Sequence, residues 1–345
     1  MVNPPAQKST RRLPAEWENS TAILISWPHK DSDWSYMLPE VSTCFTSIVK
    51  AITDEMTAIV VAPDISVPKK HLAGLDQSRI LYCQVQTNDT WARDFGPITC
   101  FDDAGNRILL DFKFNGWGLK FPADKDNLIS SKLCAAGVLK GSRENHLGFV
   151  LEGGSIESDG NGTILTTSEC LLSPNRNGNL SKEEISVYLS ESFGADKILW
   201  LDHGYLAGDD TDSHVDTLAR LAPNDTILYV KCDDKDDEHF HELELMESQL
   251  KSMRTREGLP YNLVGLPMPE PIFDEDNLRL PATYANFLIT PKSILLPIYG
   301  QPANDRLAEM IMQAVFHDRE IKCIDCRPLI RQHGSLHCVT MQLYI

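Results

Sequence analysis

Short apolar runs recur along this chain, and their length restricts the possible folds more than any other feature. Each run is four to six residues long and is bounded by proline, glycine, aspartate or asparagine. Runs of this length with such boundaries are typical of buried strands. They cover residues 22–25, 58–61, 80–85, 163–167, 227–230, 287–290 and 294–298.

Helical patterns lie between these runs. Ser181 followed by Glu184 has the form of a capping box and predicts a helix through about Ser192. Apolar residues at helical spacing predict a second helix over residues 305–316, and residues 239–257 form a third, polar candidate. Strands that alternate with helices predict an α/β fold.

The composition restricts the number of domains and the kinds of ligand that the protein can bind. The 345 residues are 42% hydrophobic and contain no low-complexity linker, so we expect one domain over residues 1–345. Lysine and arginine total 32 against 49 aspartates and glutamates, a net charge of −17. This charge disfavours nucleic-acid binding, which needs cations, and permits a small cationic ligand.

The cellular compartment is predicted from the thiols and the first residues. The polar start of the chain does not resemble a secretion signal, and no apolar run is long enough for a membrane span. The nine cysteines are irregularly spaced in a chain too long to need a disulfide framework. We therefore expect a cytoplasmic protein with reduced thiols.

Two segments place a carboxylate beside a turn. In NDTWARDFGP (88–97), Asp94 stands close to Trp91, which fits either a surface loop or a carboxylate beside an aromatic wall. In LEGGS (151–155), Glu152 precedes Gly153 and Gly154 at a predicted strand end. The two glycines permit a turn or a close approach of the backbone to a ligand.

Two further segments add a histidine and a thiol. His214 and Asp216 lie two apart in GDDTDSHVD, so on a strand they would share a face and could move a proton. The alternative is an Asp-rich loop that caps a helix. Cys338 follows His337 in QHGSLHCVT and is either a buried structural cysteine or a nucleophile activated by a distant histidine.

These polar segments are regularly spaced. Asp94 and Glu152 are 58 residues apart, Glu152 and His214 are 62 apart, and His214 and Cys338 are 124 apart. The spacing indicates a period of about 60 residues with one position skipped. A repeat of that size, with one functional residue per unit, would place these residues around a central site.

The same segments resemble those of the agmatine deiminase family, which is related to bacterial peptidylarginine deiminases within the guanidine-modifying (pentein) superfamily. The matching stretches are NDTWARDFGP, LEGGSIESDGNGT, ECLLSPNRN, GDDTDSHVD and HGSLHCVT, in the family's order. The resemblance implies a five-bladed α/β propeller with pseudo-fivefold repeats around a central active site. This agrees with the observed period.

The resemblance also implies the role of each site residue. Asp94 and Asp216 match the carboxylates that hold the guanidinium group, and Cys338 matches the nucleophile that forms a thiouronium intermediate. His214 matches the acid/base group, and Glu152 matches the carboxylate that supports this histidine and the substrate. No metal or organic cofactor is implied.

The implied substrate is agmatine, a small dication. Its hydrolysis would give N-carbamoylputrescine and ammonia, a step from arginine towards putrescine. Trp91 and Asp210 are the candidates for binding the terminal ammonium, with Trp117 behind them. Asp210 stands where the family commonly has glutamate, and Ser213 stands where it has glycine. A homodimer is a further expectation.

Four alternatives remain open. They are a peptidylarginine or other guanidine deiminase, an arginine amidinotransferase, a non-catalytic binding protein and a metal-dependent ureohydrolase. The last would use ligands from His203, Asp209, Asp212, His214 and Asp216. The CxxC pair Cys323 and Cys326 has no second pair with it, so we expect two buried cysteines and no zinc site.

Overall fold

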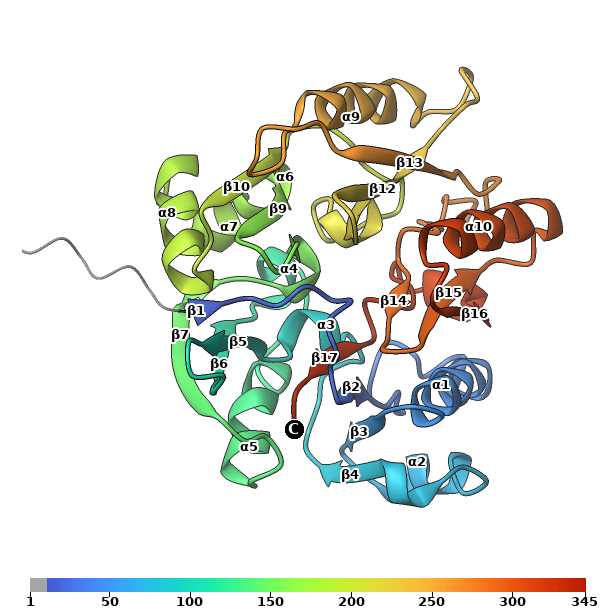
Figure 1. Cartoon of the computed structure of the whole chain (residues 1–345). Coiled ribbons are helices and arrows are strands. Elements are labelled where there is room, and N and C mark those ends of the chain that lie inside the picture. The colour runs from blue at the N-terminus through green and yellow to red at the C-terminus, as the bar shows by residue number, and fades with distance from the viewer. Residues whose placement is uncertain (1–10) are drawn as a thin grey trace, which may run out of the picture.

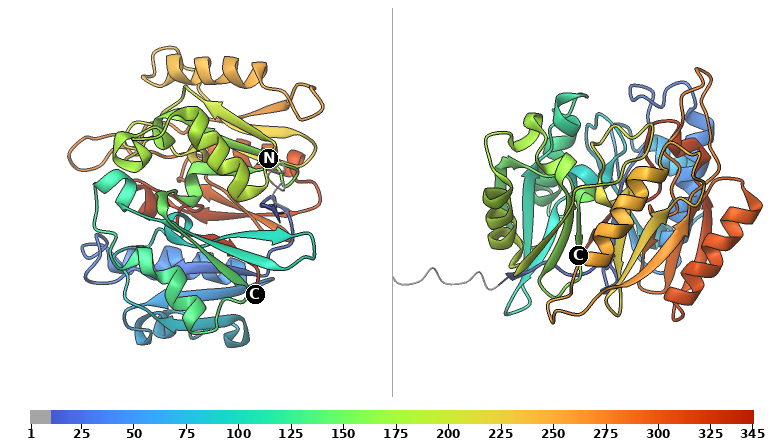
Figure 2. Two further views of the ribbon diagram at one scale, coloured as in Figure 1. Left: turned by 90° about the vertical axis from the view of Figure 1, so that its left-hand side faces the viewer. Right: turned by 90° about the horizontal axis from the view of Figure 1, so that it is seen from above.

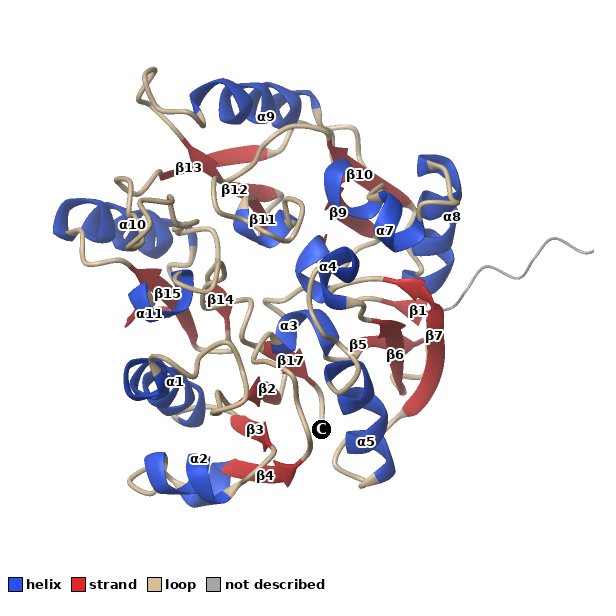
Figure 3. Cartoon of the chain, turned by 180° about the vertical axis from the view of Figure 1, so that it is seen from behind, coloured by secondary structure: helices blue, strands red, loops and turns tan. Residues whose placement is uncertain are grey.

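The computed structural model describes residues 11–345, and these residues form five small β-sheets around a common centre (Figure 1). Seen from behind, the strands form an inner ring and the longer helices lie outside it (Figure 3). The two side views in Figure 2 also place these helices on the outer surface. The architecture agrees with the predicted propeller of five α/β units.

Every sheet repeats one topology. A first strand pairs antiparallel with a second strand, and the second pairs parallel with a third. The members of the sheets are β17 (Met341–Leu343), β2 (Ala22–Ser26), β3 (Thr57–Ala62) and β4 (Ile80–Gln84); β1 (Arg11–Arg12), β5 (Ile98–Asp102), β6 (Arg107–Lys113) and β7 (Ser142–Val150); β8 (Ile156–Ser158), β9 (Thr163–Thr167) and β10 (Lys197–Leu201); β11 (Ala219–Ala222), β12 (Thr226–Lys231) and β13 (Asn262–Pro267); and β14 (Leu288–Ile289), β15 (Ser293–Ile298) and β16 (Glu320–Asp325).

In each sheet, a helix on the outer surface connects the second strand to the third, which lies parallel to it. These crossover helices are α1 (Leu38–Thr53), α5 (Ile129–Ala135), α8 (Lys182–Phe193), α9 (Phe240–Ser252) and α10 (Pro302–Val315). The shorter elements are α2 (Ser66–His71), α3 (Ala92–Phe95), α4 (Gly116–Leu119), α6 (Ser168–Leu171), α7 (Pro174–Asn177), α11 (Arg327–Ile330), and the 3₁₀ turns η1 (Gln77–Arg79), η2 (Asp126–Leu128), η3 (Gly153–Ser155) and η4 (Val215–Thr217).

The predicted strands and helices are present with small shifts. The capping box at the start of α8 is confirmed, because Ser181 Oγ accepts from Glu184 N and the Glu184 carboxylate accepts from Ser181 N. Helix α10 begins earlier than expected, with Pro302 in its first turn, where the missing N–H costs nothing. Helix α9 ends at Ser252, because residues 254–260 turn back through an Arg254–Pro260 bridge.

Of the two settings considered for His214 and Asp216, a strand and an Asp-rich loop, the structure shows the loop: His214 immediately precedes the 3₁₀ turn η4 and Asp216 lies within it. The expectation that both cysteines of the CxxC motif are buried is wrong. Cys323 is exposed on β16, although its partner in the CxxC motif, Cys326, is buried. All nine cysteines lie in the described part of the chain and are unpaired.

The strands and outer helices share one apolar core. It includes Ile23 and Ile25 of β2 and Phe45 and Ile48 of α1, all fully buried. Strands β2 and β9 are buried on both faces, which explains their continuous apolar or β-branched sequences. Within residues 11–345, no helix combines the length and apolar character needed to cross a bilayer.

Candidate active site

The segment that leads into the first strand of each sheet ends near the common centre. Asp94 lies on α3 before β5, Glu152 before β8 and Asp216 before β11. The remaining two sheets contribute Asn286 before β14 and Cys338 before β17. Each sheet is therefore preceded by at least one residue of the centre, with His214 beside Asp216 before β11. Asn286 occupies the position that the sequence period had skipped.

Asp94 and Asp216 are both buried, but their surroundings differ. Asp94 Oδ2 accepts from Trp117 Nε1 at 2.9 Å, and Oδ1 accepts from Gly154 N at 3.0 Å. Burial, together with the nearby Asp216 charge, holds the pKa of Asp94 well above its ordinary value. Burial also acts to raise the pKa of Asp216, but the hydrogen bond and charge of His337 outweigh it and leave that pKa lowered.

His214 is a buried imidazole with unused hydrogen-bonding capacity. Neither ring nitrogen has a hydrogen-bond partner among the described residues, and Nδ1 lies 3.7 Å from Asp94 Oδ1. Burial lowers the pKa of His214 to about 3, more than the Asp216 charge can offset. The ring is therefore neutral at physiological pH and can accept a proton.

Cys338 is buried beside these groups. Its Sγ lies 3.4 Å from Asn286 Oδ1, which also accepts from the Cys338 backbone N–H at 3.3 Å. Burial raises the pKa of the thiol well above its ordinary value, and the charges of Asp216 and Asp94 act in the same direction. A cation placed between the two carboxylates would offset their effect on the thiol.

Glu152 lies near His214 but does not hydrogen-bond to it. Its two carboxylate oxygens accept from Arg176 Nε at 2.9 and 3.1 Å. Arg176 also donates to Asp212 Oδ2 at 2.5 Å and to the carbonyl of Thr211 at 2.7 Å. The arginine therefore connects Glu152 to the loop that precedes His214.

The two glycines after Glu152 allow neighbouring groups to lie close to the backbone. A Cβ on Gly154 would lie 2.7 Å from His214 Nδ1 and 2.9 Å from Asp94 Oδ1, and a Cβ on Gly153 would overlap the carbonyl oxygen of Arg93. Neither glycine has a positive φ. The Gly-Gly pair is thus needed for space beside the reactive groups rather than for an unusual turn.

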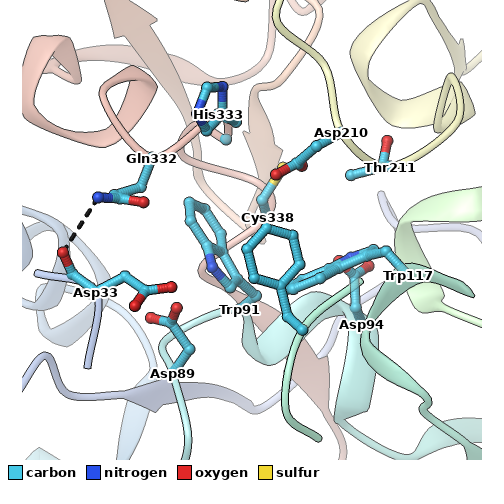
Figure 4. Close-up of a pocket in the computed structure, with 12 residues that line it drawn as sticks. Asp33, Asp89, Trp91, Asp94, Trp117, Asp210, Thr211, Gln332, His333 and Cys338 are labelled. Carbon is cyan, nitrogen blue, oxygen red and sulfur yellow. Dashed lines mark hydrogen bonds between the residues drawn. The ribbon is translucent and has the colours of Figure 1, made fainter. Parts of the chain in front are cut away.

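A pocket of about 380 Å³, partly open to solvent, leads to Cys338. Four aspartates and three aromatic side chains line it, with no lysine or arginine among the lining residues. They are Asp33, Asp89, Asp94, Asp210, Trp91, Trp117 and Phe121 (Figure 4). The lining is complementary to a ligand with positive charge at more than one point.

Two aspartates of the pocket lining, Asp89 and Asp210, change charge near neutrality. Burial and the neighbouring Asp33 charge raise the pKa of Asp89 to about 7. Burial and the Asp209 charge raise the pKa of Asp210 to about 6. In Figure 4, Asp33 and Asp89 lie on the opposite side of Trp91 from Asp210. Trp117 completes the wall with a left-handed φ of 53°, a conformation that is rare for a bulky residue.

The residues considered as ligands for a metal do not form one centre. The two clusters of three possible ligands within residues 11–345 are Glu152, Cys170 and His214, and Glu16, Glu157 and His337. In each cluster a carboxylate already pairs with a buried arginine, Arg176 or Arg220. The expected ligands also have other partners. His203 faces Glu242, and Asp209 accepts hydrogen bonds from the backbone of Thr211 and Ser213. Asp212 forms ion pairs with Arg176 and Lys120. The side chains that could bind a metal therefore already form ion pairs and hydrogen bonds within loops.

Comparison with known proteins agrees with this geometry. The family model of the Porphyromonas-type peptidyl-arginine deiminases matches residues 12–343. The chain belongs to this family. The agmatine deiminase of Stutzerimonas stutzeri is 32% identical, with 96% of this chain and 94% of that protein covered.

Solved structures place this deiminase family within the pentein superfamily. A substrate-bound Cys-to-Ser variant of the C. jejuni agmatine deiminase has a TM-score of 0.90 at 35% identity, covering 97% of this chain and 96% of that one. A Porphyromonas gingivalis protein provisionally described as an arginine deiminase has a TM-score of 0.90 at 49% identity, with 96% and 98% covered. A dimethylarginine dimethylaminohydrolase shares only the fold, with a TM-score of 0.52 at 11% identity over 94% of this chain and all of that one.

The structure of this deiminase-family chain brings the predicted residues together. Trp91, Trp117, Asp94, Asp210 and Cys338 line the pocket. Glu152, His214 and Asp216 lie behind it and are fully buried.

Sequence reasoning missed four residues of the site: Asn286 and Arg176 at the centre, and Asp89 and Asp33 in the pocket lining. Arg176 was visible as the arginine of the ECLLSPNRN stretch, and Asp89 as the first aspartate of NDTWARDFGP. Asn286 could have been found by searching the skipped period for a polar residue before the apolar run 287–290.

Proposed function

We propose that this protein hydrolyses agmatine to N-carbamoylputrescine and ammonia, as part of polyamine synthesis. The pocket carries this proposal, because four aspartates line it without a lysine or arginine. Agmatine is arginine without its α-carboxylate and is cationic at both ends. Free arginine would bring a carboxylate into a pocket that offers it no cation, so the lining favours agmatine.

The guanidinium group is held between Asp94 and Asp216. A planar guanidinium donates in pairs to carboxylates, which fixes its central carbon relative to a nearby nucleophile. The terminal ammonium then lies towards the pocket mouth, against Trp91 and near Asp210. Trp117 supports this arrangement through its hydrogen bond to Asp94.

Substrate binding activates the nucleophile. The thiol of Cys338 is neutral while Asp94 and Asp216 face it, because a thiolate would be a further negative charge in a buried site. The bound guanidinium supplies the opposing positive charge. The Cys338 proton passes to a ring nitrogen of the neutral His214, and the sulfur forms a bond to the guanidinium carbon.

Three bond changes complete the reaction. The tetrahedral adduct loses one amino group as ammonia after His214 returns the proton to it, which leaves an S-alkylthiouronium on Cys338. Water then adds to the same carbon and gives a proton to His214. Cleavage of the carbon–sulfur bond leaves the carbonyl of N-carbamoylputrescine. The hydroxyl proton passes to the sulfur and regenerates the thiol, and His214 releases its own proton to solvent. One agmatine and one water give one product and one ammonia.

Glu152 acts from behind His214. One of its oxygens lies within 4.8 Å of a ring nitrogen of His214, which is close enough to stabilise the imidazolium that forms during proton transfer. Arg176 holds this carboxylate in place through two hydrogen bonds. No organic cofactor or metal takes part in the proposed steps.

The remaining expectations about the protein stay proposals. The shared core supports a single domain, of which residues 1–10 lie outside the described part. The unpaired thiols support a cytoplasmic location, and the net charge of −17 supports the absence of nucleic-acid binding. We also propose a homodimer, which sedimentation would test.

An ammonia-release assay tests the function. Agmatine, free arginine, an arginine-containing peptide and methylated arginines are offered to the wild-type protein and to Cys338→Ser. We expect ammonia from agmatine with the wild type, and ligand binding without ammonia from the variant. Preference for the peptide would favour a peptidylarginine deiminase.

Other reaction products, or inhibition by a chelator, would distinguish the alternative classes of protein. Urea release that stops with a chelator would favour a ureohydrolase. Amidino transfer to an added amine would favour an amidinotransferase. Binding without turnover by the wild type would favour a binding protein. Full activity of Cys338→Ser would refute the mechanism.

A further inference from the structure

His337, the residue before the nucleophile, faces away from the pocket into a buried cluster of charged groups. Its ring Nδ1 lies 2.7 Å from Asp216 Oδ2, and its Nε2 lies 2.6 Å from Glu16 Oε2. Both are carboxylates, which only accept hydrogen bonds, and the 2.6 Å contact between Nε2 and Glu16 requires a proton between the two atoms. Arg220 Nη2 also lies 3.1 Å from Nε2 and 3.1 Å from Glu16 Oε2, so it faces both groups. A histidine ring donates from both nitrogens at once only when it carries a proton on each, as the imidazolium.

Charge counting supports the same protonation state. The cluster has three carboxylates and two arginines, and each of these side chains is buried. Arg220 donates to Glu157 at 2.6 Å and its Nη2 lies 3.1 Å from Glu16, while Arg93 lies 3.7 Å from Glu16. The members are Glu16, Glu157, Asp216, Arg93, Arg220 and His337. A neutral His337 would leave one uncompensated negative charge in the interior, which is costly, whereas the imidazolium balances the cluster.

The protein holds this arrangement rigidly on both sides. The Glu16 Oε1 atom accepts from Ile289 N at 2.7 Å, so Glu16 cannot turn away from the ring. The His337 backbone N–H donates to Asn286 Oδ1 at 2.8 Å. The ring therefore has one fixed orientation, with Asp216 at one nitrogen and Glu16 at the other.

We propose that His337 is a positioning residue, a fixed imidazolium that keeps Asp216 ionised and oriented to receive the substrate guanidinium. This inference rests on the proposed function for its kinetic consequences. The two carboxylates then have different roles. Asp216 is the permanent anion because of His337, whereas Asp94 receives only neutral donors, Trp117 and the Gly154 backbone.

Two substitutions separate donation to Asp216 from donation to Glu16. The amide nitrogen of asparagine can take the place of Nδ1, and that of glutamine can take the place of Nε2. His337→Asn therefore retains a donor to Asp216, and His337→Gln retains a donor to Glu16. The two variants are matched in losing the positive charge and the ring.

Steady-state kinetics with agmatine compares these variants with the wild type, after circular dichroism has shown that they are folded. We expect kcat/KM to fall about 10-fold in His337→Asn and about 100-fold in His337→Gln, within the range for hydrogen bonds to charged groups. The loss should appear mainly in KM. It should also appear as weaker agmatine binding when each change is combined with Cys338→Ser and measured by calorimetry.

Equal or greater activity of His337→Gln would overturn the proposal, as would unchanged KM and affinity with a reduced kcat. Failure of the proposed function is distinguishable, because the wild type would then release no ammonia. A measurement independent of turnover and of variant folding is the ¹⁵N spectrum of histidine-labelled wild-type protein. We expect one ring, His337, to carry protons on both nitrogens at pH 8, and its absence would also overturn the proposal.

Discussion

Replacement of Arg176 by methionine tests how strongly the site depends on a buried ion pair. The guanidinium is fully buried and makes hydrogen bonds to Glu152, Asp212 and the Thr211 carbonyl. Methionine fills similar space but leaves the Glu152 carboxylate buried without a cation. Breaking a buried pair in this way costs about 3–5 kcal/mol, a large part of an ordinary stability of about 5–15 kcal/mol.

The cost should depend on pH, because Glu152 can escape it by taking a proton. Burial already raises the pKa of Glu152 despite Arg176, and removal of the arginine raises it further. A carboxyl whose pKa is higher in the folded state loses stability as pH rises from the unfolded pKa, about 4.3, to the folded one. Arg176→Met should therefore be closer to wild-type stability at pH 5 than at pH 8.

Urea denaturation followed by fluorescence measures the free energy of unfolding of each protein at both pH values. The control is the double variant Glu152→Gln/Arg176→Met, which removes the carboxylate together with its partner. We expect it to be more stable at pH 8 than Arg176→Met alone. A loss below about 1 kcal/mol in the single variant, or strictly additive losses in the double variant, would refute this reasoning.

Three further predictions concern activity. Gly154→Ala should remain folded but lose at least about 100-fold in ammonia release, since its Cβ would displace His214 or Asp94; near-normal turnover would contradict this. Trp117→Phe removes the donor to Asp94 and should lower kcat/KM by about 10-fold, with Leu119→Ala on the exposed side of the same turn as a control expected to have no effect. As pH falls through 7 and then 6, Asp89 and Asp210 take up protons. The KM for agmatine should therefore rise relative to the KM for butylguanidine, which has no ammonium group. A ratio of the two KM values that does not change with pH would show that neither aspartate binds the ammonium.

The positions of the strands along the chain could be predicted from the sequence, because each depends on a short local run of residues. Runs such as 163–167 and 227–230 carry both the apolar character and the boundaries that define a buried strand, and both coincide closely with strands. The helix that begins after Ser181 could also be predicted from the sequence, since its capping box is formed by two residues three positions apart. Helix α9 was overestimated because a polar helix has no apolar stripe to mark its end.

Part of the site could not be read from sequence, for a physical reason. Glu16 and His337 are 321 positions apart in the chain, and only the closed ring brings their side chains into contact. The partner of Glu152 is Arg176 rather than His214, a choice made by packing around two buried side chains and not by spacing. Segments that carry chemistry were recognisable, but pairings within the centre required coordinates.

Pairing of β17 with β2 has a consequence for the order of biosynthesis. Met341 lies opposite Leu24, so β2 is synthesised long before β17, the strand that completes its sheet. Cys338 belongs to the same late segment. A nascent chain that already displays Asp94, His214 and Asp216 therefore has an open strand edge and no thiol. The complete set of active-site residues is therefore assembled only when the ring closes.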